Sequence, residues 1–112
     1  MLTASIIFFA AAAIVGLTLA VRIFQNKNTP LPMTLTHGFF AASGLTLLII
    51  YASGQPEHSP VTSIVLFCIA VTGGVVLFAR DMMNKSLPKP LIIVHASVAL
   101  LSFAILLFAA FG

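Results

Sequence analysis

Charged residues are scarce in this sequence. Five Lys or Arg and two Asp or Glu occur among 112 residues, which is 6% charged, whereas soluble domains carry roughly a quarter. Hydrophobic residues make up 61% of the chain, and the mean hydropathy is +1.20. This composition excludes a water-soluble globular fold and predicts an integral membrane protein surrounded by the lipid bilayer.

Cysteines and acids are almost absent as well. Cys68 is the single cysteine, so no intramolecular disulfide can form. Glu57 and Asp81 are the only acids, and we expect them at opposite membrane faces, which excludes a carboxylate pair. No nucleophile with a base beside it and no glycine-rich phosphate loop occurs. A hydrolytic or group-transfer site is therefore not visible, and a redox role is left open.

Four apolar runs are each long enough to cross a membrane, which takes about 20 residues. They lie near 3–24, 33–53, 60–81 and 90–111, and the residues between them are too few for a soluble domain. The first run lacks the basic flank of a signal peptide, so we expect it to stay in place as a span. The sequence thus predicts a single transmembrane domain over residues 1–112, an all-α four-helix bundle.

The positive charges predict how the spans are oriented. They follow the first and third runs and are absent from the middle connection SGQPEHSP. By the positive-inside rule the loops after the first and third spans lie in the cytoplasm, and both termini lie outside. The net charge of +3 is thus a topology signal and gives no reason to expect nucleic-acid binding. We expect a multi-pass protein of a bacterial inner membrane.

The two halves of the chain resemble each other. Residues 1–54 align without a gap on residues 59–112, so that RIFQNKNTPLP falls on RDMMNKSLPKP and His37 falls on His95. Lipid does not demand these polar and proline identities. The alignment predicts two tandem helical hairpins, related by a pseudo-two-fold axis along the membrane normal, because units of two helices insert the same way up.

Under this symmetry the two histidines face each other. Each lies five residues after a proline that starts its helix, about 7 Å along the helix axis. Ionisable groups at such depth usually face the bundle interior and mark function. A single histidine is most simply explained as a hydrogen bond between helices. Two facing imidazoles are poor partners for each other, so we expect a group between them that binds both.

Small residues follow each histidine on the same helix face, at offsets of four and seven. On their own, such small residues are explained by helix packing in lipid. Together with the paired histidines, the stripes look like a slot for a flat macrocycle, and histidine is a standard axial ligand of haem iron. We therefore expect His37 and His95 to ligate the iron of one haem b. Arg22 and Arg80, symmetric at the same end, are candidates for contacts with the haem propionates. The predicted cofactor-binding residues are His37, His95, Ala41, Gly44, Ala99, Ser102, Arg22 and Arg80.

With its paired histidines and four spans, the chain resembles four-helix transmembrane b-type cytochromes. That resemblance implies axial ligation by His37 and His95, with Gly44 as a small residue beside the macrocycle. Such proteins commonly carry a second histidine pair near the other membrane face. The outer halves of these spans have none, so one haem per chain is expected, near the cytoplasmic face.

The sequence thus predicts a small haem-binding membrane protein that transfers electrons or handles haem, with a quinone or a redox protein as partner. Gly16, Gly73 and Gly74 offer surfaces for close helix packing, consistent with a homodimer. The alternative is a non-haem four-span protein, either an assembly subunit or a small transporter, with a proton-responsive histidine pair. The length and the four spans also resemble small multidrug-resistance transporters. Those transporters depend on a glutamate in the first helix, and residues 3–24 contain no acid, which counts against that class.

Overall fold

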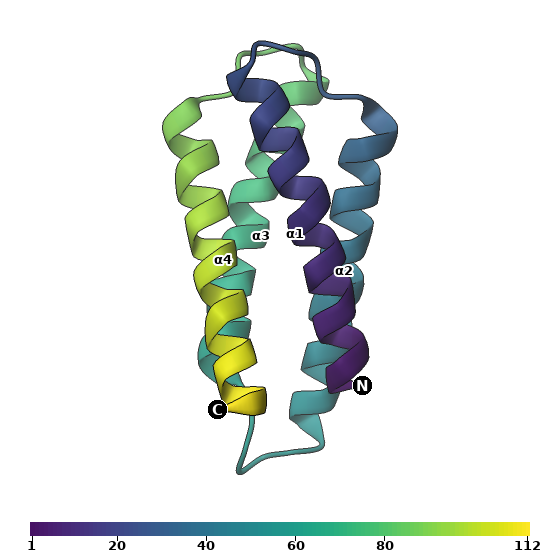
Figure 1. The fold of residues 1–112 in the computed structure, drawn as a ribbon, viewed down its shortest axis with the longest axis vertical. Coiled ribbons are helices and arrows are strands. Elements are labelled where there is room, and N and C mark those ends of the chain that lie inside the picture. The colour runs from purple at the N-terminus through teal and green to yellow at the C-terminus, as the bar shows by residue number, and fades with distance from the viewer.

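The chain folds into four antiparallel helices joined by three short loops (Figure 1). The computed structural model describes residues 1–112 and contains no strand. Each helix begins and ends within two residues of a predicted span, and all four are long and apolar enough to cross a membrane. The chain is therefore a multi-pass membrane protein. The helices are α1 (Leu2–Phe24), α2 (Leu31–Ser53), α3 (Val61–Met82) and α4 (Lys89–Phe111).

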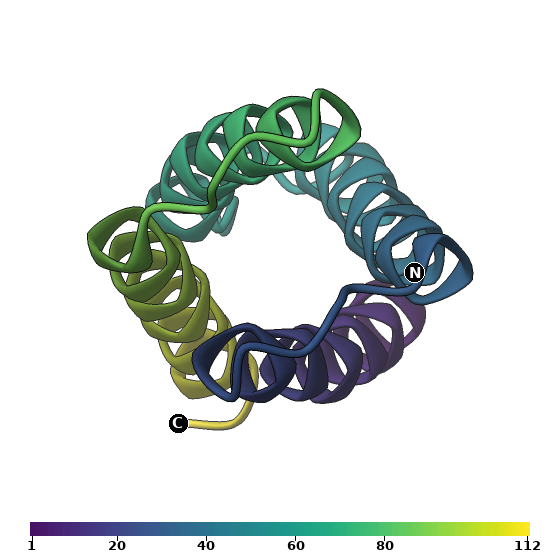
Figure 2. The same ribbon diagram turned by 90° about the horizontal axis from the view of Figure 1, so that it is seen from above.

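The bundle measures 44 × 24 × 21 Å and has two distinct ends. Loops 25–30 and 83–88 lie together at one end, which we call the basic end. Both chain termini and loop 54–60 lie at the other, which we call the terminal end (Figure 1). Seen from above, the helices form a four-sided ring in which α1 lies opposite α3 and α2 lies opposite α4 (Figure 2). Each helix therefore contacts its two neighbours.

The apolar core is a small layer nearer the terminal end. It consists of Phe9, Leu48, Phe67 and Leu106, one residue from each helix. The rings of Phe9 and Phe67 stack with centroids 3.9 Å apart and planes 1° apart. They belong to α1 and α3, so this stack bridges the ring of helices along one diagonal. Most other large apolar side chains are exposed, as expected for helices that face lipid.

The loop at the end of α1 has a defined backbone geometry. The N–H of Lys27 donates to Arg22 O at 2.8 Å, and the N–H of Asn26 donates to Ile23 O at 3.0 Å. Asn26 has a φ of 58°. These are the two bonds of a Schellman motif with a left-handed residue after the helix. The motif satisfies carbonyls that the end of a helix would otherwise leave without partners.

The loop at the end of α3 repeats this geometry. Lys85 N–H donates to Arg80 O at 2.9 Å, and Asn84, with a φ of 56°, donates to Asp81 O at 3.1 Å. The next helix then begins after Pro88, with a second proline in its first turn, as α2 begins after Pro30. Asparagine tolerates a left-handed backbone and proline suits a first helical turn. The turn chemistry therefore accounts for the Asn and Pro identities between the two halves.

Some residues at corresponding positions of the two halves have the same packing, and others do not. Phe9 and Phe67 form one stack, and Leu48 and Leu106 are both fully buried. The halves differ at Thr29, whose hydroxyl donates to Asp81 Oδ2 at 2.9 Å across the basic end, because neither residue has a polar counterpart in the other half. The tandem duplication and its pseudo-two-fold axis stay predictions.

Candidate functional site

A largely apolar cavity of about 640 Å³ lies inside the ring of helices. All four helices contribute to its lining, and 25 of the 34 lining residues are hydrophobic. The stacked Phe9 and Phe67 line it on the side of the core layer, and Thr29 and Asp81 line it at the basic end. The volume is in the range of sites that hold cofactors and other small molecules.

His37 and His95 both line this cavity, and each is held by a backbone carbonyl. His37 Nδ1 lies 2.8 Å from Ala12 O, and His95 Nδ1 lies 2.7 Å from Ala70 O. A carbonyl only accepts, so Nδ1 carries the proton and donates. In a neutral imidazole this leaves the lone pair on Nε2. Both side chains therefore present an unprotonated nitrogen that can bind a metal.

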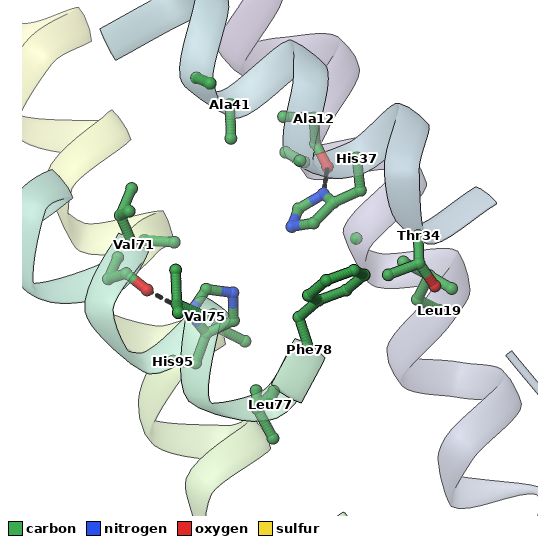
Figure 3. A pocket seen from close by; sticks show the side chains of 18 of the residues that line it. Ala12, Leu19, Thr34, His37, Ala41, Val71, Val75, Leu77, Phe78 and His95 are labelled. Atoms are coloured by element: carbon green, nitrogen blue, oxygen red, sulfur yellow. Dashed lines mark hydrogen bonds between the residues drawn. The ribbon is translucent and has the colours of Figure 1, made fainter. Parts of the chain in front are cut away.

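The two imidazoles face each other across the cavity. Their ring centroids are 6.3 Å apart and their planes are nearly perpendicular, at 84°. Figure 3 shows the second nitrogen of each ring turned away from its carbonyl partner and toward the other histidine. Because α2 and α4 occupy opposite corners of the ring, these side chains meet near the middle of the bundle.

Only some of the predicted small residues line the cavity. Ala41 and Ala99, one turn after the histidines, do so. Gly44 and Ser102 lie a further turn toward the core layer and do not. Gly44 packs against Phe9, since a Cβ built on it would lie 3.0 Å from that ring. The Ser102 hydroxyl donates to Val98 O in its own helix. The stripe thus continues past the cavity into the core.

The two arginines predicted to contact propionates bind the loops instead. Arg22 Nε donates to Asn28 O at 2.9 Å, and Arg80 Nε donates to Ser86 O at 2.8 Å. Neither arginine lines the cavity. Their side chains are half-buried against the loops that they cross. In this arrangement the arginines contribute positive charge to the basic end without reaching the site.

Several residues at the site did not emerge from the sequence. The carbonyls of Ala12 and Ala70 hold the imidazoles, and Gly16 and Gly74 lie against the same rings. The alignment of the two halves pairs Gly16 with Gly74, and this pairing is the sequence feature that could have marked them as part of the site. Gly16 and Gly74 are thus covered in part by histidines of the same chain, and the expected homodimer stays a prediction.

The cavity also has features that no motif predicts. Phe78 lines it beside the two histidines (Figure 3), and its counterpart in the first half is Ala20. Asp81 is the only acidic residue in the lining, and its carboxylate accepts from Thr29. Both depend on how the two hairpins meet, which the pattern of one helix does not contain.

The cavity holds two imidazole nitrogens with free lone pairs, and no third protein group is placed beside them as a ligand. No group of three or more His, Cys, Asp or Glu side chains is placed to hold a metal ion. A tetrahedral zinc site needs three or four protein ligands, so the donor set does not fit one. Two opposed imidazoles fit a metal that carries its remaining ligands with it.

Comparisons of this chain with protein-family models, with curated proteins and with solved structures find no match.

Proposed function

We propose that this protein binds one haem b between His37 and His95 and serves in one-electron transfer or haem handling within the membrane. The observation that carries the proposal is the facing pair of Nε2 atoms. A metal–imidazole bond of about 2.0 Å and a ring centroid about 1.2 Å behind its nitrogen put the centroids of two opposed ligands about 6.4 Å apart. The observed separation is 6.3 Å.

The size and lining of the cavity favour a haem over a bare metal ion. An ion held by two imidazoles needs no 640 Å³ space around it. A porphyrin brings four equatorial nitrogens and needs only axial ligands, which the two histidines supply. Its apolar faces would contact a lining that is mostly hydrophobic, including Ala41 and Ala99 beside the ligands.

Each part of the site has a separate task in this proposal. When bound, haem supplies reversible one-electron chemistry. The Ala12 and Ala70 carbonyls fix the tautomer and the orientation of the histidine rings, as hydrogen-bond partners of metal ligands do. The largely apolar lining would limit the access of water to a bound haem. The cations at the basic end would attract anionic propionates from a distance, because none of these side chains lines the cavity.

The proposal predicts a coloured protein. Purified in detergent, or titrated with haemin, the wild-type chain should show a Soret band that sharpens and shifts to longer wavelength on reduction. His37→Ala and His95→Ala should each abolish this six-coordinate low-spin spectrum, because each removes one axial ligand. His58→Ala is the matched control, since His58 is exposed in loop 54–60 and its loss should change nothing.

A colourless wild-type protein that takes up no haemin would refute the haem proposal. That result would favour the alternative of a non-haem membrane protein whose paired histidines respond to protons. Haem binding that survives both His37→Ala and His95→Ala would instead show that the ligands are wrongly assigned. Reduction of the bound haem by a quinol would identify a quinone as the partner.

A further inference from the structure

The histidines dock on two matching places in the odd-numbered helices. His37 binds the Ala12 carbonyl, four residues before Gly16, and His95 binds the Ala70 carbonyl, four residues before Gly74. In an α-helix the C=O of one residue points along the axis to the N–H four residues later. Each histidine therefore approaches a carbonyl that already belongs to a helix, at the turn occupied by glycine.

The glycines leave these carbonyls uncovered. A side chain in a helix leans toward the N-terminus and covers the preceding turn. A side chain at position 16 or 74 would thus lie over the carbonyl that the imidazole uses. The distances agree: a Cβ built on Gly16 would lie 2.7 Å from His37 Cε1 and 3.0 Å from its Nδ1. A Cβ on Gly74 would lie 3.1 Å from His95 Cε1.

We propose that Gly16 and Gly74 are positioning residues: each opens a helix carbonyl to an imidazole, which fixes the proton on Nδ1 and turns Nε2 into the cavity. The pattern Ala-x-x-x-Gly in α1 and α3 is then the docking surface for the histidines of α2 and α4. This inference rests on the proposed function for its purpose, but the docking itself exists without a ligand.

The two glycines should differ in how strictly they are required. At position 16 a methyl group would meet His37 below 3.0 Å, so the ring or the helix must shift. At position 74 the closest approach is 3.1 Å, which a small movement of His95 relieves. Gly38, next to His37 on α2, has no atom within 4 Å of an added Cβ. Gly38→Ala is therefore a matched control for a change from glycine to alanine in a helix.

The test is ¹⁵N NMR of the histidine rings in the full-length, haem-free protein, in a His58→Ala background. A protonated and an unprotonated ring nitrogen have well-separated ¹⁵N shifts. We expect the wild type to show Nδ1–H and a free Nε2 at both rings. Gly16→Ala should disturb His37 alone, Gly74→Ala should disturb His95 less, and Gly38→Ala should disturb neither.

A second measurement uses haemin. Partners that orient metal ligands typically contribute about 10- to 100-fold to metal affinity, so Gly16→Ala should weaken haemin binding by that factor and lose low-spin spectrum. Helix content by circular dichroism checks that the variant folds. If Gly16→Ala does not fold, the same measurements on Gly74→Ala test the positioning role.

The outcomes separate this inference from the proposed function. If Gly16→Ala folds and keeps the wild-type ring shifts, or if Gly38→Ala disturbs His37 equally, the positioning role is refuted whether or not haem binds. If the ring shifts follow the expected pattern but the wild type binds no haemin, the haem proposal fails and the docking stands.

Discussion

At the scale of single residues, two serines at corresponding positions differ in whether their buried hydroxyl is hydrogen-bonded. Ser5 is buried in α1 and donates to Gly44 O of α2 at 2.8 Å. Ser63, at the corresponding position of α3, is buried to the same degree, but its hydroxyl has no hydrogen-bond partner. A buried hydroxyl contributes to stability only when it is paired, and costs free energy when it is not.

These serines give a matched pair of substitutions. Ser5→Ala should lower the free energy of unfolding by about 1 kcal/mol, because it removes a hydrogen bond between two helices. Ser63→Ala removes an unpaired polar group and should leave stability unchanged or raise it. Unfolding in mixed micelles, followed by circular dichroism, measures both. Equal losses from the two substitutions would show that Ser63 is paired in the membrane.

At the scale of structural elements, the turns at the basic end set where each even-numbered helix starts. Each turn combines an asparagine in the left-handed region with an arginine that crosses to a loop carbonyl, and a proline follows. The start of the helix fixes the height of its histidine. Two turns of the same shape therefore place His37 and His95 at one depth.

The left-handed asparagines make these turns testable. A β-branched residue at a φ of 58° is strained by about 1–2 kcal/mol, whereas glycine adopts it freely. Asn26→Val should thus lower the free energy of unfolding by that amount, and Asn26→Gly should preserve it. Gln25→Ala is the control, since Gln25 has an ordinary φ of −90°. The prediction fails if Asn26→Val unfolds at the same SDS fraction as Asn26→Gly.

At the scale of the whole molecule, an even number of helices puts both termini at one end with loop 54–60. All five Lys and Arg residues lie toward the other end, in or beside loops 25–30 and 83–88. All the positively charged Lys and Arg side chains therefore lie at one end of the bundle. Cells retain such basic loops in the cytoplasm, and this orientation is open to direct measurement.

Single cysteines at the two ends report the orientation. In a Cys68→Ser background, Glu57→Cys in intact bacterial cells should react with a membrane-impermeant maleimide. Lys85→Cys should react only after the cells are permeabilised. Cys68 must be removed first because it is exposed on α3. If Lys85→Cys is labelled in intact cells and Glu57→Cys is protected, the protein has the opposite orientation.

The sequence predicts the four helices well because burial in lipid is a property of each segment alone. Apolar run length gives their bounds within two residues, and the repeated prolines place the histidines at one level. Ala41 and Ala99 fall on the cavity because one helical turn keeps a residue on the histidine's face. These inferences need no knowledge of a neighbouring helix.

The remaining contacts of the site depend on which residues of a neighbouring helix or loop lie against each side chain. Two turns beyond the histidine, Gly44 meets the ring of Phe9 from α1 instead of a cavity. Arg22 is satisfied by a carbonyl six residues away in its own loop, which the path of the loop decides. The docking of His37 on Ala12 and Gly16 needs the register between α1 and α2. None of these is contained in the periodicity of one helix.

The stacked phenylalanines have an electrical consequence. Phe9 and Phe67 line the cavity on the side of the terminal end, so a haem bound between the histidines as proposed would lie on the basic side of that layer. An electron that passed to and from such a haem through the basic end would move no net charge across the bilayer, so the membrane potential would do no net work on the cycle. Turnover of the proposed carrier would then be electroneutral over each complete cycle.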